Sequence, residues 1–260
     1  MPLDIDGVPV LAAGLALAAA LVVRKRRAAA AAALLAAQPS APPLGQRWRN
    51  VIPRAVHRLE TGGFVVVSQG SVVDCEMDAI VNAANCGMLG GGGVDGAISK
   101  AGGPELLAAR KALPVLPGKR RNRCATGGAK ITVGGRLNAN WCIHAVGPNY
   151  RVLEGLGKSL EDGDRLLHGA YLKSMQLAKE NGGIQTVGFS LLSAGIFRGP
   201  RSLRAVLDIA VRAVLDGAFG GLEEVHLVAF TEEELDECCA ALGRAASKGG
   251  GRVTPGHEKK

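Results

Sequence analysis

The stretch from Asp78 to Gly102, DAIVNAANCGMLGGGGVDGAISKAG, constrains the fold more than any other part of the chain. Its apolar start, Ala79 to Val81, predicts a short buried strand, and the glycines Gly90 to Gly93 follow after a polar turn. The pattern from Ala97 onward predicts the opening of a helix. Glycine amides can approach an anion closely, and a helix N-terminus attracts it. This order of elements therefore predicts a phosphate-binding loop.

Three polar side chains in the same stretch add chemistry to that loop. Asn82 and Asn85 each carry a donor and an acceptor, which suits the hydroxyls of a ribose. Asp95 supplies a carboxylate that could orient a water molecule or take its proton. The alternative is a flexible glycine turn with asparagines that cap and bend the chain. The position between a strand and a helix favours the phosphate site.

Strand and helix patterns alternate along the rest of the chain, which predicts an α/β sandwich. Ligands of such sheets bind beyond the carboxyl ends of the strands. His144 lies between two apolar residues and is interpreted as a hydrogen-bonded core or rim histidine. Short β-branched or apolar runs predict strands at 64–68, 129–133, 141–146, 186–190 and 225–230, and helical spacing predicts helices at 105–113, 164–180 and 202–216 and after Thr231.

Five motifs occur in an order that resembles the macrodomain family, in particular its MacroD-like branch of ADP-ribose-binding hydrolases. The resemblance covers roughly residues 62 to 245. It is carried by VNAAN with LGGGGVDGAI, then GGPELLAAR, TGGAKIT at 126–132, WCIHAVGPNY at 141–150 and LLSAGIFRGP at 191–200.

This resemblance implies a three-layer α/β/α sandwich with a mixed, mostly parallel six-stranded sheet and ADP-ribose in a cleft between two loops. It implies no metal and no organic cofactor. Asn85 and Asp95 are the expected catalytic residues: the first positions the ribose, and the second orients water, alone or with a substrate phosphate. The expected ligand-binding residues are Ser71, Val72, Asn82, Gly92, Gly93, Val94, Ser193, Ala194, Gly195, Ile196, Phe197 and Phe230, the last beside adenine.

The function implied is a hydrolase that removes mono-ADP-ribose from acidic side chains of proteins, deacylates O-acetyl-ADP-ribose, or does both. The alternative is a reader that binds ADP-ribose without cutting it. Ser71 stands where the family has an aspartate that selects adenine, and Ser99 stands where MacroD-like members tend to have histidine. Arg198 and Gly199 replace a small residue and a second aromatic. These departures weaken the case for the enzyme, and Arg198 could pair with phosphate or point to solvent.

The charge distribution argues against nucleic acid as a partner. The net charge is +8, but residues 61–245 carry 19 residues of each sign, so the excess lies in the flanks. We expect three regions: a separate N-terminal segment at 1–50, a macrodomain at 60–245 and a disordered basic tail at 246–260. ADP-ribose or a mono-ADP-ribosylated protein is the expected partner, and the domain is expected to be a monomer.

The segment at 1–50 contains an uncharged apolar run, Val8 to Val23, followed by Arg24 to Arg27. It predicts either a membrane anchor, with the macrodomain facing the cytoplasm, or an organellar targeting peptide. The six cysteines form no CxxC pair, which is typical of reduced thiols in an intracellular protein.

Overall fold

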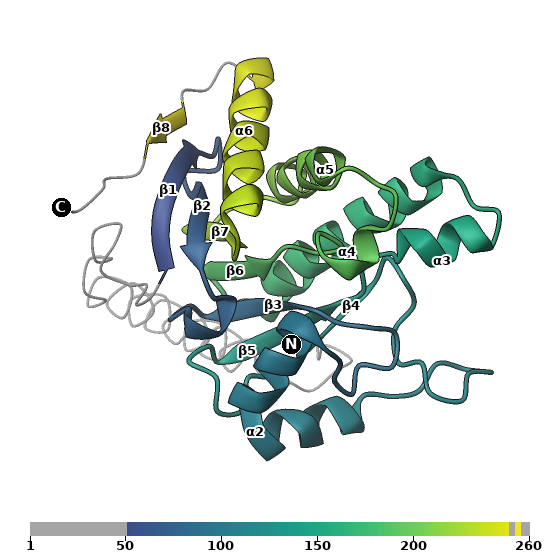
Figure 1. Ribbon diagram of the computed structural model, residues 1–260. Coiled ribbons are helices and arrows are strands. Elements are labelled where there is room, and N and C mark those ends of the chain that lie inside the picture. The colour runs from purple at the N-terminus through teal and green to yellow at the C-terminus, as the bar shows by residue number, and fades with distance from the viewer. Residues whose placement is uncertain (1–50, 250–252, 256–260) are drawn as a thin grey trace, which may run out of the picture. The chain divides into compact units, whose positions relative to one another are not determined.

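All strands of the described part of the chain join one mixed sheet, in the order β4-β5-β3-β6-β7-β2-β1-β8 (Figure 1). The coordinates are a computed structural model that describes residues 51–249 and 253–255. The five strands from β5 to β2 in this order pair in parallel, and antiparallel strands flank them. The strands are β1 Val51–Arg58, β2 Phe64–Gly70, β3 Ala79–Ala83, β4 Ala129–Val133, β5 Trp141–Ala145, β6 Thr186–Ser190, β7 Glu224–Ala229 and β8 Val253–Pro255.

The mixed, largely parallel sheet was predicted correctly, but the count of six strands was wrong. Each of the six expected strands is present, and β1 and β8 extend the sheet beyond β2. The register of β1 shifts between Pro53 and Ala55, which interrupts the alternation of buried and exposed side chains. A mixed pattern of this kind does not identify a strand in the sequence.

Two helices begin or end at other residues than expected. The helix after the glycine loop begins at Gly93 rather than Ala97, and it runs through a break at Gly103 to Ala112. The last helix continues to Gly249, so the region expected to be a disordered tail starts inside that helix and then contributes β8. The helices are α2 Gly93–Ala112, α3 Tyr150–Gly155, α4 Leu160–Asn181, α5 Leu203–Asp216 and α6 Glu232–Gly249, with 3-10 turns η1 Val72–Asp74 and η2 Ile196–Arg198.

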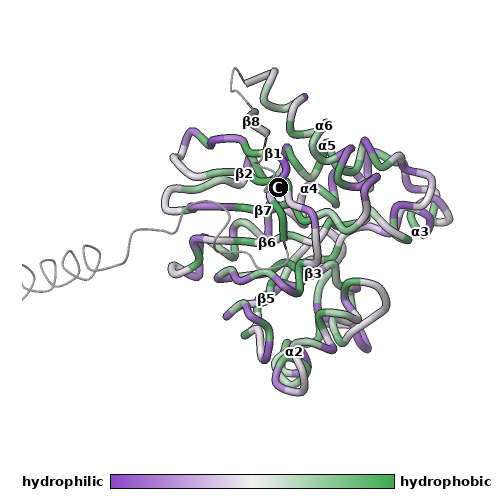
Figure 2. The backbone as a smooth tube through the Cα atoms, turned by 60° about the vertical axis from the view of Figure 1, so that its left-hand side comes forward, coloured by the Kyte–Doolittle hydropathy of each residue, from purple (hydrophilic) through white to green (hydrophobic). Residues whose placement is uncertain are grey.

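Helices cover both faces of the sheet, which confirms the three-layer sandwich. The larger core lies between the sheet and α4, α5 and α6, and a smaller one lies under α2 and η1. Side chains alternate accordingly along β3, where Val81 enters the larger core and Ile80 the smaller one. Figure 2 shows hydrophobic residues recurring along the strands, while the helices carry both colours, as amphipathic helices do.

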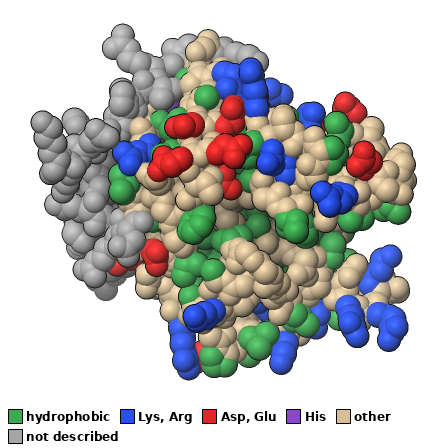
Figure 3. Space-filling model, viewed as in Figure 1, with side chains coloured by type: hydrophobic (Ala, Val, Ile, Leu, Met, Phe, Trp, Pro, Cys, Tyr) green, Lys and Arg blue, Asp and Glu red, His purple; other side chains and the backbone are tan. Residues whose placement is uncertain are grey.

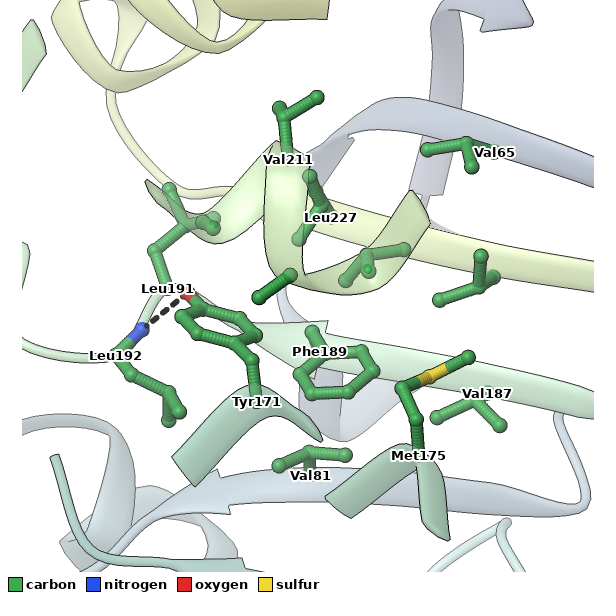
Figure 4. Close-up of a cluster of buried hydrophobic side chains, with 14 of the residues drawn as sticks. Val65, Val81, Tyr171, Met175, Val187, Phe189, Leu191, Leu192, Val211 and Leu227 are labelled. Atoms are coloured by element: carbon green, nitrogen blue, oxygen red, sulfur yellow. Dashed lines mark hydrogen bonds between the residues drawn. The ribbon is translucent and has the colours of Figure 1, made fainter. Parts of the chain in front are cut away.

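The larger core holds the start of a loop that faces the ligand site. Tyr171 of α4 stacks on Phe189 of β6 with ring centroids 5.3 Å apart (Figure 4). The amide of Leu192 donates a hydrogen bond of 2.9 Å to the buried hydroxyl of Tyr171. The end of β6 is thereby fixed to a packed layer, which positions the residues that follow it.

The apolar run Val8–Val23 and the domain assigned to 1–50 lie outside the described residues. Within 51–249 and 253–255, the helices are all too short or too polar to cross a bilayer.

Candidate functional site

A cavity of about 450 Å³ opens at the carboxyl ends of β2, β6 and β7, next to the N-terminus of α2. Figure 3 shows hydrophobic side chains gathered near the middle of this face, with acidic groups above them over α6. Six of the expected ligand residues line the cavity, namely Ser71, Val72, Gly93, Val94, Gly195 and Phe230. The other lining residues are Gly70, Ala97, Ser190, Leu191, Val228 and Glu234.

The glycine loop needs glycine for two different reasons. Gly90 and Gly93 have φ values of 113° and 56°, a region that other residues rarely adopt. A Cβ at Gly91 would lie 3.0 Å from Asp95 Oδ2 and 3.3 Å from Asn85 Nδ2. The two expected catalytic side chains thus converge on Gly91, and the missing side chain leaves the space between them. At Gly93 a Cβ would meet nothing within 4 Å, so the backbone there faces open space.

Asn85 shapes the loop with most of its hydrogen-bonding capacity. Its Oδ1 accepts from the amides of Gly87 and Met88 at 3.0 and 3.3 Å, and its Nδ2 donates to Gly90 O at 2.9 Å. One amide hydrogen remains for a ligand, since the side-chain amide has two. Asn85 is half-buried and is not among the residues that line the cavity.

Asp95 lies beneath the loop, in the first turn of α2, and is only 3% exposed. Its Oδ1 accepts a hydrogen bond from Asn82 Nδ2 at 2.7 Å and pairs with Arg110 Nη1 at 2.8 Å. Arg110, 1% exposed, also donates to Ser99 Oγ and to the carbonyl oxygen of Met88. Asp95 Oδ2, on the Gly91 side, has no hydrogen-bond partner. One oxygen of the carboxylate is therefore paired with Arg110 and Asn82, and the other is left without a hydrogen-bond partner.

Asn82 and His144 continue this buried network toward the sheet. Both are fully buried: the Asn82 side chain bonds to Asp95 and does not line the cavity, and its contact with ligand stays a prediction. Asn82 Nδ2 lies 3.1 Å from His144 Nδ1, and His144 Nε2 lies 3.0 Å from Thr132 Oγ1. Burial, and then the charge of Arg110, lower the pKa of His144 to about 3. The imidazole is neutral and belongs to the core, as expected.

The second loop, 193–199, presents its backbone rather than its polar side chains. Ser193 has a φ of 56°, and its hydroxyl donates to Pro148 O at 2.7 Å, which ties the loop to the end of β5. Gly195 lines the cavity, and a Cβ there would meet nothing within 4 Å. Ala194 is buried and Ile196 is 90% exposed, so neither lines the cavity, and Phe197 does not line it either.

At the other end of the cavity the lining side chains are accessible. Phe230 is 77% exposed, so it is not a core residue. Glu234, in the first turn of α6, also lines this end, and its Oε2 accepts from the amides of Phe230 and Thr231 at 2.9 and 3.1 Å. Ser71 lines it too, while its Oγ accepts weakly from Val73 N at 3.3 Å. An aromatic face and a carboxylate thus stand together.

Sequence reasoning missed two functional side chains, Arg110 and Glu234. Arg110 reads as an ordinary cation in the last turn of a helix, because nothing local indicates that the break at Gly103 folds it back over Asp95. Glu234 follows Thr231 by three residues, a capping-box spacing that does predict the start of α6. That signal gives the position of the helix and says nothing of the cavity beside it.

Comparisons with known proteins agree with this geometry. A model of the Macro domain matches residues 81–207. An O-acetyl-ADP-ribose deacetylase of Escherichia fergusonii is 41% identical over 169 residues, which are 64% of this chain and 88% of the relative. A macro domain-containing protein of Cupriavidus necator is 43% identical over 175 residues, covering 66% of this chain and 94% of the relative.

Solved structures give the same result. The Oceanobacillus iheyensis macrodomain with ADP superposes with a TM-score of 0.64 at 27% identity, over 77% of this chain and all of that one. The Trypanosoma brucei macrodomain in complex with ADP-ribose gives 0.56 at 31% identity, over 69% of each chain. The Oceanobacillus macrodomain shares the expected fold over its whole length. The chain belongs to the macrodomain family.

Proposed function

We propose that this protein binds ADP-ribose in the cavity and hydrolyses esters that join a carboxylic acid to its distal ribose. Substrates of this kind are O-acetyl-ADP-ribose and proteins that carry mono-ADP-ribose on acidic side chains. In both, water attacks, one C–O bond of the ester is cleaved, and the free carboxylic acid and ADP-ribose are released. The observation that carries the proposal is the convergence of Asn85 and Asp95 on Gly91, beside a cavity bordered by two glycine-containing loops.

The diphosphate would lie between the two loops. The first amides of α2, at Gly93 and Val94, have no partner within the helix, and both residues line the cavity. They face an anion with the added attraction of the helix dipole. Gly195 offers its backbone from the other side. Because these donors are fixed before binding, they hold the pyrophosphate at little cost in ordering.

The distal ribose would then reach the space over Gly91. The remaining amide hydrogen of Asn85 donates to a ribose hydroxyl, and Asp95 Oδ2 accepts from the attacking water once the backbone at Gly91, before the start of α2, shifts from above it. Arg110 and Asn82 hold the other carboxylate oxygen, so the free oxygen stays aimed at the loop. Most of the rate would come from positioning and from stabilising the leaving carboxylate.

The adenine would occupy the accessible end of the cavity. Phe230 offers an exposed ring for stacking. Glu234 supplies an acceptor for the exocyclic amine, in the place of the aspartate that Ser71 replaces. A carboxylate forms a stronger, charge-assisted bond than a hydroxyl. Adenine selection would therefore depend on α6 instead of the turn after β2.

A reader that binds ADP-ribose without hydrolysis is the second candidate. It is favoured by the burial of Asp95, whose Oδ1 is paired with Arg110. The other oxygen, Oδ2, is also buried, and Asp95 is not part of the cavity wall.

One experiment separates the two functions. ADP-ribose binding is measured by calorimetry, and release of acetate and of label from a glutamate-modified protein is followed for wild type, Asn85→Ala and Asp95→Asn. For the enzyme, both variants lose about 10² to 10³ in turnover. Binding in wild type with no release of either product would identify a reader.

A further inference from the structure

The segment that joins α2 to β4 forms a closed turn on the surface. Its backbone is fixed by hydrogen bonds from Leu116 N to Asn122 O, 2.8 Å, and from Lys119 N to Leu116 O, 3.0 Å. Pro117 and Gly118 stand at the bend, where Gly118 has a φ of 70°, as a Pro-Gly turn requires. Lys119, Arg120 and Arg121 follow at once, and we call these three residues the basic turn.

The chain that follows the basic turn is bonded to Cys86 and Gly87, next to Asn85. The amide of Arg123 donates to Cys86 O at 2.8 Å, and its Nη1 donates to Gly87 O at 3.3 Å. Gly87 in turn donates to Asn85 Oδ1 at 3.0 Å, and a Cβ at Gly87 would lie 4.0 Å from Arg121 O. Arg123, two residues after the basic turn, is thereby bonded to Cys86 and Gly87, which follow Asn85 directly, at the end of the site where the distal ribose is placed.

The cations of the basic turn are exposed, and none of the ion pairs found within 51–249 uses them. They belong to a section, residues 96–140, that contains nine Lys and Arg residues and a single acid. Residues 231–237, at the adenine end, contain five acids and neither Lys nor Arg. Figure 3 shows acidic groups over α6 and further basic groups on the lower side of the same face. The basic turn and the adenine end therefore differ in the sign of their charge.

We propose that the basic turn docks an acidic segment of the polypeptide that carries the ADP-ribose. This inference rests on the proposed function, in which the carrier is attached through the distal ribose and must leave the site past Asn85. A carrier modified on one acidic side chain, within an acidic sequence, meets a patch of opposite charge there. Such complementarity raises the rate of productive encounter and depends on ionic strength.

A polypeptide fits better than a nucleic acid. A protein that binds a phosphate backbone needs a basic groove that follows many phosphates. Here three consecutive exposed cations lie on one short turn, and the adenine end of the cleft carries acidic residues. Three cations on a rigid turn match a short run of carboxylates.

The test uses the triple variant Lys119→Gln, Arg120→Gln, Arg121→Gln in the full chain. The control variant, Lys158→Gln, Lys179→Gln, Arg212→Gln, removes the same charge from exposed positions in and beside α4 and α5. Four substrates are compared at low salt. They are O-acetyl-ADP-ribose, a glutamate-ADP-ribosylated peptide with acidic flanks, the same peptide with neutral flanks, and a terminally ADP-ribosylated oligonucleotide.

We expect kcat/KM of the triple variant to fall about tenfold for the acidic peptide, and the loss to shrink with added salt. Turnover of O-acetyl-ADP-ribose and of the neutral peptide should change less than about twofold, since neither bears the acidic flanks that feel the charge. The control variant should match wild type on all substrates. An equal loss on every substrate, no loss on the acidic peptide, or a loss confined to the oligonucleotide would overturn the proposal.

Measurements of binding distinguish a failure of the hydrolase assignment from a failure of the basic-turn proposal. If wild type cleaves nothing, the hydrolase assignment fails, and the basic turn is then judged by the Kd of the acidic peptide against that of free ADP-ribose. The triple variant should weaken the first about tenfold and leave the second unchanged. Equal Kd values for wild type and variant on the acidic peptide would remove the basic turn from recognition.

Discussion

The two ends of the cleft differ in how their polar groups meet water. At the adenine end, Phe230 is 77% exposed and the carboxylate of Glu234 lines the cavity. At the ribose end, Asn82, Asp95 and Arg110 are all at most 3% exposed and bond to one another. The difference teaches that substitutions at the first end act on affinity, because these side chains line the cavity, whereas substitutions at the second end act first on folding.

The largest effect is expected for Arg110→Met, at the buried end. Removing the guanidinium leaves the Asp95 carboxylate buried without its partner, which costs about 3 to 5 kcal/mol. Urea unfolding at neutral pH measures this loss. Adding Asp95→Asn should restore part of it, because the uncompensated charge is gone.

Arg136→Met is the matched control. Arg136 and Glu105 also form an ion pair, but both side chains are more than half exposed, so the change in unfolding free energy should be small. Equal losses for the two arginine variants would contradict the contrast between buried and exposed polar groups.

The second prediction uses pH at the same buried end. The folded pKa of His144 is lowered to about 3, below its ordinary value of 6.5. The unfolded chain therefore binds the proton more readily between those values, and the stability that neutral His144 supplies is complete above about pH 6.5 and is lost as the pH falls. From pH 7 to 5 this contribution falls by about 2 kcal/mol.

His144→Gln should reduce the acid-induced loss of stability by about that amount, measured by urea unfolding at both pH values. His226, whose pKa burial also lowers, keeps its own share in the variant. An unchanged slope for His144→Gln would mean that the imidazole is not held neutral.

The accessible end was easier to predict from sequence than the buried one. Phe230 follows an apolar strand directly, so its place at the carboxyl end needed only strand recognition, and the cavity confirms that place. The pattern around Asp95 indicates a helix start but not depth, because depth depends on Arg110, which follows 15 residues later beyond a break. The burial of Asn82 could not be predicted for the same reason. Its partners come from α2 and β5, and local sequence does not show them.

The strands also differ in how well the sequence predicted them. FVVVS and the other β-branched runs identified the central strands, because strands covered on both faces are apolar throughout. Strand β1, beyond the parallel strands, is only partly buried and has a bulge between Pro53 and Ala55, so periodicity fails there. In loop 193–199, the sequence predicted that the backbone at Gly195 borders the cavity. It did not predict the hydrogen bond from the Ser193 hydroxyl to Pro148 O.

The third prediction turns to the adenine end. Phe230→Ala should weaken ADP-ribose binding by roughly tenfold, about 1.4 kcal/mol, because it removes a stacking surface. Calorimetry measures the affinity, and urea unfolding should show little change, since the ring is mostly exposed already. Ile196→Ala, which removes an even more exposed side chain outside the cavity, should leave both unchanged. A large loss of stability in Phe230→Ala would erase the distinction between the two ends.

The smallest effect is expected for Glu234→Gln. The amide retains an oxygen that can accept from the amides of Phe230 and Thr231, so α6 should stay capped, but the bond to the adenine amine loses its charge assistance. We expect ADP-ribose affinity to fall about threefold to fivefold. The preference over an analogue with hypoxanthine, which has an oxygen in place of the amine, should fall as well, because glutamine can donate to that oxygen while glutamate repels it.

Glu233→Gln, exposed in the same turn, is the control. Adding Ser71→Asp to Glu234→Gln should restore the preference if a carboxylate at this end is what selects the base, and an unchanged preference in every variant would show that stacking on Phe230 alone holds the nucleobase.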